Sequence, residues 1–370
     1  MKDRSAIIFV PYIEAFGGCE RLLLDLSRYL NSQGIKHKVI CYRHEIDLSN
    51  YSEWPIKVAD LTQSNNPLRR AGYLKKYLSE QSFDQLGETL LVGLQAARHA
   101  GYLGLNNYSV LIIDPPSLLQ PVESRWKNIL DRFRNIITIN YVRRGMARAS
   151  WTAVMTQYIS SEIINLCGVH PLLIRPGVSL GAEHFKIRFH STSEPFHILS
   201  VSRLEKSKRI DWIFKALECL DKNNGNFPNG FSWVFDVAGS GSDETRLKRM
   251  AREKGLSDKV VFHGHVSPDG LKKLFSMAHL FVMPARQGYG LPALESLIQG
   301  IPVLLHRESG VGEILGETQW AEVVDDDSLV EGLERMVDRV RSGFMKTTPL
   351  PYIPSSQDWA KQICRQCRWQ

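Results

Sequence analysis

Two adjacent glycines, Gly17 and Gly18, could bring a phosphate group against the backbone. They lie between an apolar run that predicts a strand and a pattern that predicts a helix. Glycine has no Cβ, so the chain can approach a ligand closely at such a turn. The free amides at the start of the following helix favour an anion. An ordinary glycine turn explains the same dipeptide, and both interpretations stay open.

A basic loop, Arg203–Lys208, follows the predicted strand His197–Val201 and carries three cations within six residues. An arginine can grip a phosphate with two parallel hydrogen bonds, whereas a lysine acts as a point charge. Such a loop at the carboxyl end of a strand can hold a diphosphate. A solvated basic loop would have the same composition.

The loop Gly288–Glu295 is the third candidate. Its two glycines lead into Leu291 and Pro292, and the proline suits the first position of a helix. Backbone amides there would face an anion. Glu295, one turn further on, could accept hydrogen bonds from sugar hydroxyls, or it could serve only the helix dipole.

Short apolar runs alternate with helical patterns along the whole chain, which predicts βαβ units and parallel sheets. The predicted strands of the first half are Ile7–Val10, Val39–Tyr42, Leu90–Val92, Val110–Ile113, Ile136–Thr138, Ala153–Met155 and Leu172–Ile174. Those of the second half are His197–Val201, Trp233–Val237, Val260–Phe262, Leu280–Met283 and Val303–Leu305. Predicted helices include Arg21–Asn31, Thr245–Lys254 and Pro292–Ile298.

The length of 370 residues suits two domains, and the periodicity stops between Gly177 and Pro195, as in a linker. Ligands bind beyond the carboxyl ends of parallel strands, so we expect the site in a cleft between the domains. Trp359 is expected to anchor a last helix, Gln357–Arg365. The predicted parts are an acceptor-side domain at residues 1–185, a nucleotide-sugar domain at 190–350 and a terminal segment at 351–370 that packs towards the first domain.

The order and spacing of several segments resemble the family 4 retaining glycosyltransferases of GT-B fold. The resemblance covers nearly the whole chain and is strongest from His197 to Glu313. The matching segments are Gly17–Glu20, Ile174–Val178, Ser202–Leu204 with Lys208, Val237–Gly241, Val260–Gly264, Gly288–Glu295 and Gly300–Val303.

This resemblance implies an α/β protein of GT-B fold, with two Rossmann-like domains that face a central cleft. It implies that a hexose-type sugar moves, with retention, from a nucleoside diphosphate sugar to a glycan or lipid-linked acceptor, without a metal or another cofactor. Arg203 and Lys208 would hold the diphosphate, and Glu295 would bind the ribose. The residues that would contact the donor through the backbone are Gly17, Gly18, Gly239, Gly290, Leu291 and Pro292.

One position departs from the family pattern, which usually has two glutamates with seven residues between them, the second of which is Glu295 here. Gln287 stands in place of the first. Glutamine keeps a carbonyl acceptor but loses the charge, so it either lowers activity or adapts the site to another donor. The rival interpretations are an epimerase or phosphorylase on this fold, and a partner that binds without turnover, which Gln287 would favour.

On the acceptor side, Asp114 in the segment Ile113–Ser117 could orient an acceptor hydroxyl. It could equally cap a turn before the two prolines.

The net charge of +7 favours anionic partners. The basic segment Arg125–Arg148 could lie on anionic lipid as an amphipathic helix, or pack on the first sheet. No signature of a nucleic-acid-binding fold accompanies the charge. We see no signal peptide and no stretch long enough to cross a membrane, and therefore expect a cytoplasmic protein, either free or at the inner membrane face.

Three further patterns have ordinary explanations. Cys364 and Cys367 form a C-x-x-C without nearby ligands, so reduced cysteines are favoured over a metal site. Asp325–Asp327 contain a D-x-D but precede a helix start, where aspartates serve as caps and dipole partners. His263 and His265 are expected either to be structural or to line the cleft.

Overall fold

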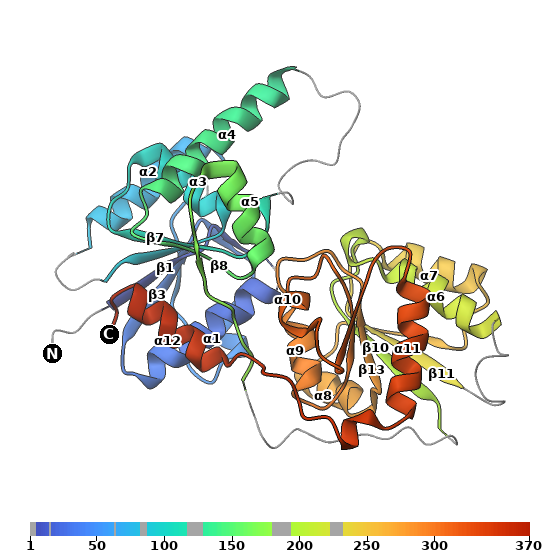
Figure 1. Cartoon of the computed structure of the whole chain (residues 1–370). Helices are drawn as coiled ribbons and strands as arrows, with labels where there is room; N and C mark the ends of the chain where they lie inside the picture. Colours follow the sequence, from blue (N-terminus) through green and yellow to red (C-terminus); the bar gives the residue numbers. More distant parts are fainter. Residues whose placement is uncertain are drawn as a thin grey trace. The chain divides into compact units, whose positions relative to one another are not determined.

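The computed structural model describes residues 5–14, 16–62, 64–81, 87–116, 129–179, 194–222 and 232–370. The chain divides into two compact units. The first unit comprises Met1–Ser179 together with Pro354–Gln370, and the second comprises Leu180–Ile353. Each unit is an α/β layer structure around a parallel sheet (Figure 1), which confirms the predicted fold class.

The first unit is built on a seven-stranded sheet in which every pairing is parallel. Its strands are β1 (Ser5–Phe9), β3 (Lys36–Cys41), β5 (Val58–Asp60), β6 (Thr89–Val92), β7 (Tyr108–Ile112), β8 (Thr152–Val154) and β9 (Leu172–Leu173). Their order is β5-β3-β1-β6-β7-β8-β9, so the direction of travel reverses between β1 and β6. A separate short ladder joins β2 (Tyr12–Ile13) to β4 (Arg43–His44).

Helices cover both faces of this sheet (Figure 1). One face carries α2 (Pro67–Ser79), α3 (Leu94–Leu103), α4 (Ile129–Ala147) and α5 (Gln157–Cys167), whose apolar side chains share one core with the strands. The other face carries α1 (Gly18–Ser32) and α12 (Ser356–Gln366). A 3₁₀ turn, η1 (Leu48–Tyr51), follows β4.

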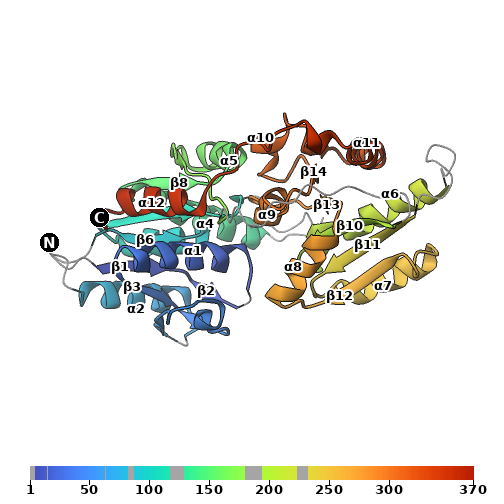
Figure 2. The ribbon, with the colours of Figure 1, turned by 90° about the horizontal axis from the view of Figure 1, so that it is seen from below.

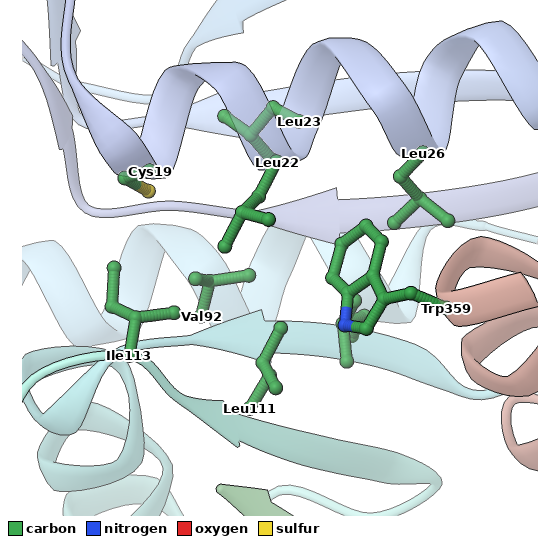
Figure 3. A pocket seen from close by; sticks show the side chains of 9 residues that line it. Cys19, Leu22, Leu23, Leu26, Val92, Leu111, Ile113 and Trp359 are labelled. Atoms are coloured by element: carbon green, nitrogen blue, oxygen red, sulfur yellow. The ribbon is translucent and has the colours of Figure 1, made fainter. Parts of the chain in front are cut away.

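The C-terminal helix α12 packs against α1, which joins the segment Pro354–Gln370 to the first unit. Trp359 is buried and lies over the sheet next to Leu26 (Figure 3), as expected for the residue that anchors this helix. The small apolar gap between the two helices and the sheet is lined by Cys19, Leu22, Leu23, Leu26, Leu90, Val92, Leu111, Ile113 and Trp359.

The second unit has a six-stranded parallel sheet in the order β12-β11-β10-β13-β14-β15. Its strands are β10 (Phe196–Val201), β11 (Trp233–Ala238), β12 (Val260–Gly264), β13 (Leu280–Met283), β14 (Val303–His306) and β15 (Ala321–Val324). Its helical elements are η5 (Lys206–Lys208), α6 (Ile210–Lys222), α7 (Glu244–Glu253), α8 (Pro268–Met277), α9 (Leu291–Leu297), α10 (Gly312–Leu315), α11 (Leu329–Arg341) and η6 (Phe344–Lys346). Figure 2 shows α6, α7 and α11 on one side of this sheet, and α8 and α9 on the other.

The predicted strand Ile136–Thr138 is wrong, because these residues lie inside α4. Ile136 and Ile137 are exposed, while Val142 and Met146 on the same helix are buried in the core. Tertiary packing along α4 therefore decides the local structure and overrides the β-propensity of the isoleucines. The short strands β5 and β15 lack a long apolar run and were not predicted.

Close contact between α3 and α4 depends on two glycines that face one another. A Cβ on Gly101 would lie 1.9 Å from the carbonyl oxygen of Tyr141, and one on Gly145 would lie 1.8 Å from that of Ala97. Atoms that are not bonded to one another cannot approach so closely. The two helices approach at backbone distance only because both positions lack a side chain.

We expect Gly101→Ala to lower the free energy of unfolding of the first unit by about 2–3 kcal/mol, because the methyl group forces the helices apart. Gly72→Ala on α2 is the matched control, since nothing lies within 4 Å of its added Cβ. That change should stabilise the helix by about 0.5–1 kcal/mol. Urea unfolding of both variants checks the difference, and equal midpoints would contradict the close packing.

Candidate active site

The strand order of the second sheet places two of the predicted loops beside one another. β10 lies between β11 and β13, and the order reverses between β10 and β13. Ligands of open parallel sheets bind beyond the carboxyl ends of the strands at such a reversal. Arg203 and Lys208 follow β10, and Gln287 and Gly290 follow β13.

The side chains of Lys208 and Gln287 meet across this reversal. The Lys208 ammonium donates to Oε1 of Gln287 at 3.4 Å, at the long end of hydrogen-bond distances. The amide nitrogen of Gln287 turns to the sulfur of Met283, at the end of β13. Gln287 therefore presents its carbonyl oxygen to the ammonium, and its neutral amide adds no negative charge at this contact.

Arg203 lies on the same loop in a more open position. Its side chain is 60% exposed and forms an ion pair with Glu205, with 3.1 Å between Nη1 and Oε1. The backbone beside it is fixed, because the amide of Leu204 donates to Ser240 at 2.9 Å and the carbonyl of Leu204 accepts from Asp243 at 2.9 Å. The guanidinium can thus change position while the loop that carries it stays in place.

Gly239 has a clear structural reason to lack a side chain. Its φ is +130°, and a Cβ there would lie 1.9 Å from the carbonyl oxygen of Ser202. The turn after β11 therefore packs backbone to backbone against the start of the Arg203 loop. A contact between Gly239 and a donor stays a prediction.

Gly290 shapes the entry into α9. Its φ is +118°, and a Cβ would approach Cε of Met283 at 2.7 Å and Nε2 of Gln287 at 2.8 Å. The glycine therefore leaves the space that the Gln287 side chain occupies. α9 begins at Leu291 with the proline second, so the expectation that Pro292 takes the first position is wrong.

Glu295 lies one helical turn after Leu291 on α9, as predicted from the sequence. Its backbone carbonyl accepts a hydrogen bond from the Gln299 amide at 3.2 Å. α9 has only seven residues. That Arg203, Lys208 and Glu295 bind a donor stays a prediction.

Sequence reasoning missed Glu308, which joins the two loops of the site. Its Oε2 lies 2.5 Å from Nη2 of Arg209, directly after Lys208. Its Oε1 lies 3.8 Å from Nε of Arg286, directly before Gln287. Its backbone carbonyl accepts from the amide of Gln287 at 3.2 Å. We call these contacts the Glu308 bridge.

Arg209, the partner in this bridge, adopts an unusual backbone conformation. Its φ of +53° lies in the left-handed region, which is costly for a residue with a side chain. Its guanidinium lies 4.3 Å from the centre of the Trp212 ring and 3.1 Å from Nδ1 of His306. In the sequence, Arg209 is visible only as the residue directly after Lys208. That position does not indicate its pairing with Glu308.

Beside the Glu308 bridge lies a hollow of about 380 Å³, lined by Arg209, His306, Arg307, Glu308 and Asp325–Asp327. Asp326 pairs with His306 at 2.8 Å and Asp325 with Arg307 at 2.9 Å. The cap of α11 is Ser328. The expectation that an aspartate caps the helix is therefore wrong. Asp326 pairs instead with the last residue of β14, and Asp325 with the residue that follows it.

In the first unit the two predicted glycines differ. Gly17 precedes α1, and its amide donates to Oε2 of Glu20 at 3.0 Å. That carboxylate occupies the position that an anionic ligand would take on the Gly17 amide. Nothing lies within 4 Å of a Cβ on Gly18, so this residue is the more open of the two.

Asp114 follows β7 and lies close to the start of α1. Burial raises the pKa of the Cys19 thiol well above its ordinary value, and the charges of Glu20 and Asp114 raise it further. The structure thus brings Asp114 to the same end of the first unit as Gly17 and Gly18. Ser117, the last residue of the predicted segment, lies outside the described residues.

Several other predicted features are now placed. Although burial alone would raise the pKa of Asp236, hydrogen bonds from His197 and His263 lower it, which gives His263 a structural partner. Cys364 and Cys367 are buried thiols, and burial raises the pKa of each.

No helix among the described residues is long and apolar enough to cross a membrane. The basic segment Arg125–Arg148 is described only from residue 129 on.

Comparison with known proteins agrees with this geometry. Residues 183–340 match the family model "Glycosyl transferases group 1". A GDP-mannose-dependent alpha-(1-6)-phosphatidylinositol monomannoside mannosyltransferase of Mycobacterium tuberculosis is 26% identical over 232 residues, which are 60% of this chain and 57% of that protein. An uncharacterized glycosyltransferase of Methanocaldococcus jannaschii is 31% identical over 145 residues, 38% of this chain and 35% of that protein. The matches thus span about a third to just over half of the length of these relatives.

Solved structures show the fold. WaaG, a glycosyltransferase involved in lipopolysaccharide biosynthesis, aligns with a TM-score of 0.68 at 15% identity and covers 99% of this chain and 95% of that chain. Sucrose-phosphate synthase from Thermosynechococcus elongatus aligns with a TM-score of 0.74 at 13% identity over 99% and 98%. HepE of Anabaena in complex with UDP aligns with a TM-score of 0.67 at 14% identity over 99% and 100%.

The chain therefore has the GT-B fold, and its residues 183–340, which carry Lys208, Gln287 and the Glu308 bridge, match the glycosyl transferases group 1.

Proposed function

We propose that this chain is a retaining, metal-independent glycosyltransferase that moves a hexose-type sugar from a nucleoside diphosphate sugar to a glycan or lipid-linked acceptor. The observation that carries the proposal is the contact between Lys208 and Gln287 at the reversal of the second sheet. It brings a cation and a neutral hydrogen-bonding amide together in the unit that matches the family.

The chemical step breaks the bond between the sugar C1 and the diphosphate oxygen. Negative charge then develops on the leaving phosphate, and fixed cations stabilise it most where water is excluded. Lys208 is held beside Gln287, whereas the exposed Arg203 can turn from Glu205 to the phosphate. These two cations take the part that a metal ion plays in other phosphate chemistry.

The acceptor hydroxyl forms the new bond to C1 on the face from which the diphosphate departs, which retains the configuration. Its proton passes to the leaving phosphate oxygen, so the step needs no nucleophile from the protein. The side-chain amide of Gln287 accepts a hydrogen bond from a sugar hydroxyl or donates one to it. Glu295 binds the ribose. Gly18 contacts the diphosphate through its backbone, and Asp114 orients the acceptor hydroxyl in this proposal.

The exposed part of α4 supports a peripheral contact with anionic membrane, which would suit a cytoplasmic enzyme with a lipid-linked acceptor. Ile136 and Ile137 are 55% and 53% exposed, and Arg143 and Arg144 on the same helix are exposed as well. Apolar and basic side chains together are what an anionic lipid surface attracts.

With a panel of GDP, UDP and ADP sugars and with glycan and lipid acceptors present, we expect release of free nucleoside diphosphate from at least one donor. GDP-mannose belongs in the panel because the mycobacterial relative is named for it, and UDP sugars because HepE binds UDP. Lys208→Ala should lower kcat/KM by about 100-fold or more, because charge on the leaving phosphate loses its fixed ammonium.

Lys206→Ala is the matched control, since Lys206 lies on the same 3₁₀ turn and is exposed. It should transfer sugar at nearly the normal rate. Equal rates in the two variants, or no diphosphate released from any donor, would rule out this mechanism.

We expect Gln287→Glu to lower kcat/KM by about tenfold with the chain's own donor. The new carboxylate would sit next to Lys208 and compete with the diphosphate for its charge, and it would lose the contact between the amide and Met283. Steady-state kinetics measures the change. A rise of tenfold would show instead that Gln287 impairs transfer, as the interpretation of a binding partner requires.

The Glu308 bridge should act as one unit. Glu308→Ala is expected to lower kcat/KM by about tenfold, because the loops of Lys208 and Gln287 lose their common support, and Arg209→Ala should have a similar effect. The double variant should lose little more than either single one. Asp325→Ala, which removes an exposed ion pair on the next loop, is the control, and additive losses would contradict the bridge.

A further inference from the structure

A cluster of three potential metal ligands lies at the edge of the first sheet, away from the residues discussed so far. Cys41 is the last residue of β3, Asp60 the last of β5, and His44 belongs to β4. One ligand atom from each lies within 4.8 Å of the other two. Within the described ranges, this is the one group of three such residues that could hold a metal ion.

The sheet itself brings the cysteine and the aspartate together. Cys41 and Asp60 are register partners in the parallel pair β3–β5. Their neighbours Ile40, Tyr42, Ala59 and Leu61 pack into the core beneath α2 and α3. Because side chains alternate along a strand, Cys41 and Asp60 both point to the opposite face. His44 reaches them through the turn Cys41–His44, a C-x-x-H spacing of the kind found at metal sites.

The contacts within the cluster converge on one carboxylate oxygen. The Cys41 thiol donates to Oδ1 of Asp60 at 3.1 Å, and Nδ1 of His44 lies 2.7 Å from the same oxygen. The sulfur and the ring nitrogen therefore both face one carboxylate oxygen, and a divalent cation could bind between the three atoms. The sulfur is buried, whereas the His44 and Asp60 side chains are 34% and 29% exposed, which leaves a path for an ion from solvent.

We propose that Cys41, His44 and Asp60 form a binding site for one Zn²⁺ ion, with water as the fourth ligand. A thiolate, an imidazole and a carboxylate are the side chains that Zn²⁺ prefers, and the thiolate disfavours Mg²⁺ and Ca²⁺. Tetrahedral Zn²⁺ needs ligand atoms about 3.3–3.6 Å apart. The distances of 3.1 Å and 2.7 Å to Oδ1 of Asp60 would therefore lengthen by about half an ångström. The Cys41 sulfur and the His44 ring nitrogen already lie within 4.8 Å of one another.

Binding must remove the thiol proton. Burial raises the pKa of the Cys41 thiol above its ordinary value, and the Asp60 carboxylate raises it further. Zn²⁺ binds cysteine as the thiolate, so each ion bound displaces the thiol proton. The charges then balance, because one thiolate and one carboxylate meet a divalent cation.

The ion would link β3 to two short elements, β4 and β5, at the margin of the sheet. β5 has three residues and β4 has two, so few backbone hydrogen bonds hold them. An ion that binds only the folded chain stabilises it by mass action. The site would therefore support the edge of the first unit, independently of sugar transfer in the second.

We expect calorimetric titration of the full, untagged chain with ZnCl₂, after chelator treatment, to show one ion bound per chain and a raised melting temperature. His44→Gln should weaken binding by about 100-fold or more, since it removes a direct ligand. Cys41→Ser should do the same. Cys219→Ser, a free cysteine of the second unit, is the matched control and should bind as the unchanged chain does.

Co²⁺ in place of Zn²⁺ reports the ligand type, because a thiolate ligand gives an intense charge-transfer absorption. That band should be present in Cys219→Ser and absent in Cys41→Ser. His44 is half-exposed, so His44→Gln can be judged even if Cys41→Ser fails to fold. Failure to bind Zn²⁺, or equal affinity in His44→Gln and the unchanged chain, would overturn the proposal whatever the transfer assay shows.

Discussion

The ammonium of Lys208 and the carbonyl of Gln287 meet where the strand order of the second sheet reverses. Loops that leave neighbouring parallel strands in opposite directions diverge at this point, and the divergence opens room for a ligand. Apart from the contact between Lys208 and Gln287, the two diverging loops need support from elsewhere in the unit. The Glu308 bridge supplies that support, since it contacts the residue after Lys208 and the residue before Gln287.

The charges around the reversal are arranged so that support and ligand binding do not compete. The Glu308 carboxylate pairs with Arg209 and Arg286, while Gln287 faces Lys208 without a charge of its own. A carboxylate at position 287 would compete with the diphosphate for the ammonium of Lys208. Gly290 belongs to the same arrangement, because its φ of +118° disfavours a side chain and a Cβ there would lie 2.8 Å from the present position of the Gln287 amide nitrogen.

Features of the fold and the site could be predicted where they depend on neighbouring residues, and not where they depend on contacts between distant segments of the chain. Apolar runs and glycine-rich turns are local signals, and they predicted the parallel sheets and the positions of Arg203, Lys208 and Gln287 at strand ends. The strand predicted at Ile136–Thr138 failed because long-range packing of α4 against α3 decides that segment. Glu308 could not be predicted, because its link to Arg209 depends on the register of β14 beside β13.

The same argument applies to the edge of the first sheet. The C-x-x-H spacing of Cys41 and His44 is visible in the sequence, but two ligands do not make a site. The third, Asp60, belongs to a three-residue strand that has no apolar run of its own and is defined by its pairing with β3. A sheet can thus assemble a ligand set from residues that sequence reading leaves apart, because register, not local pattern, decides which side chains become neighbours.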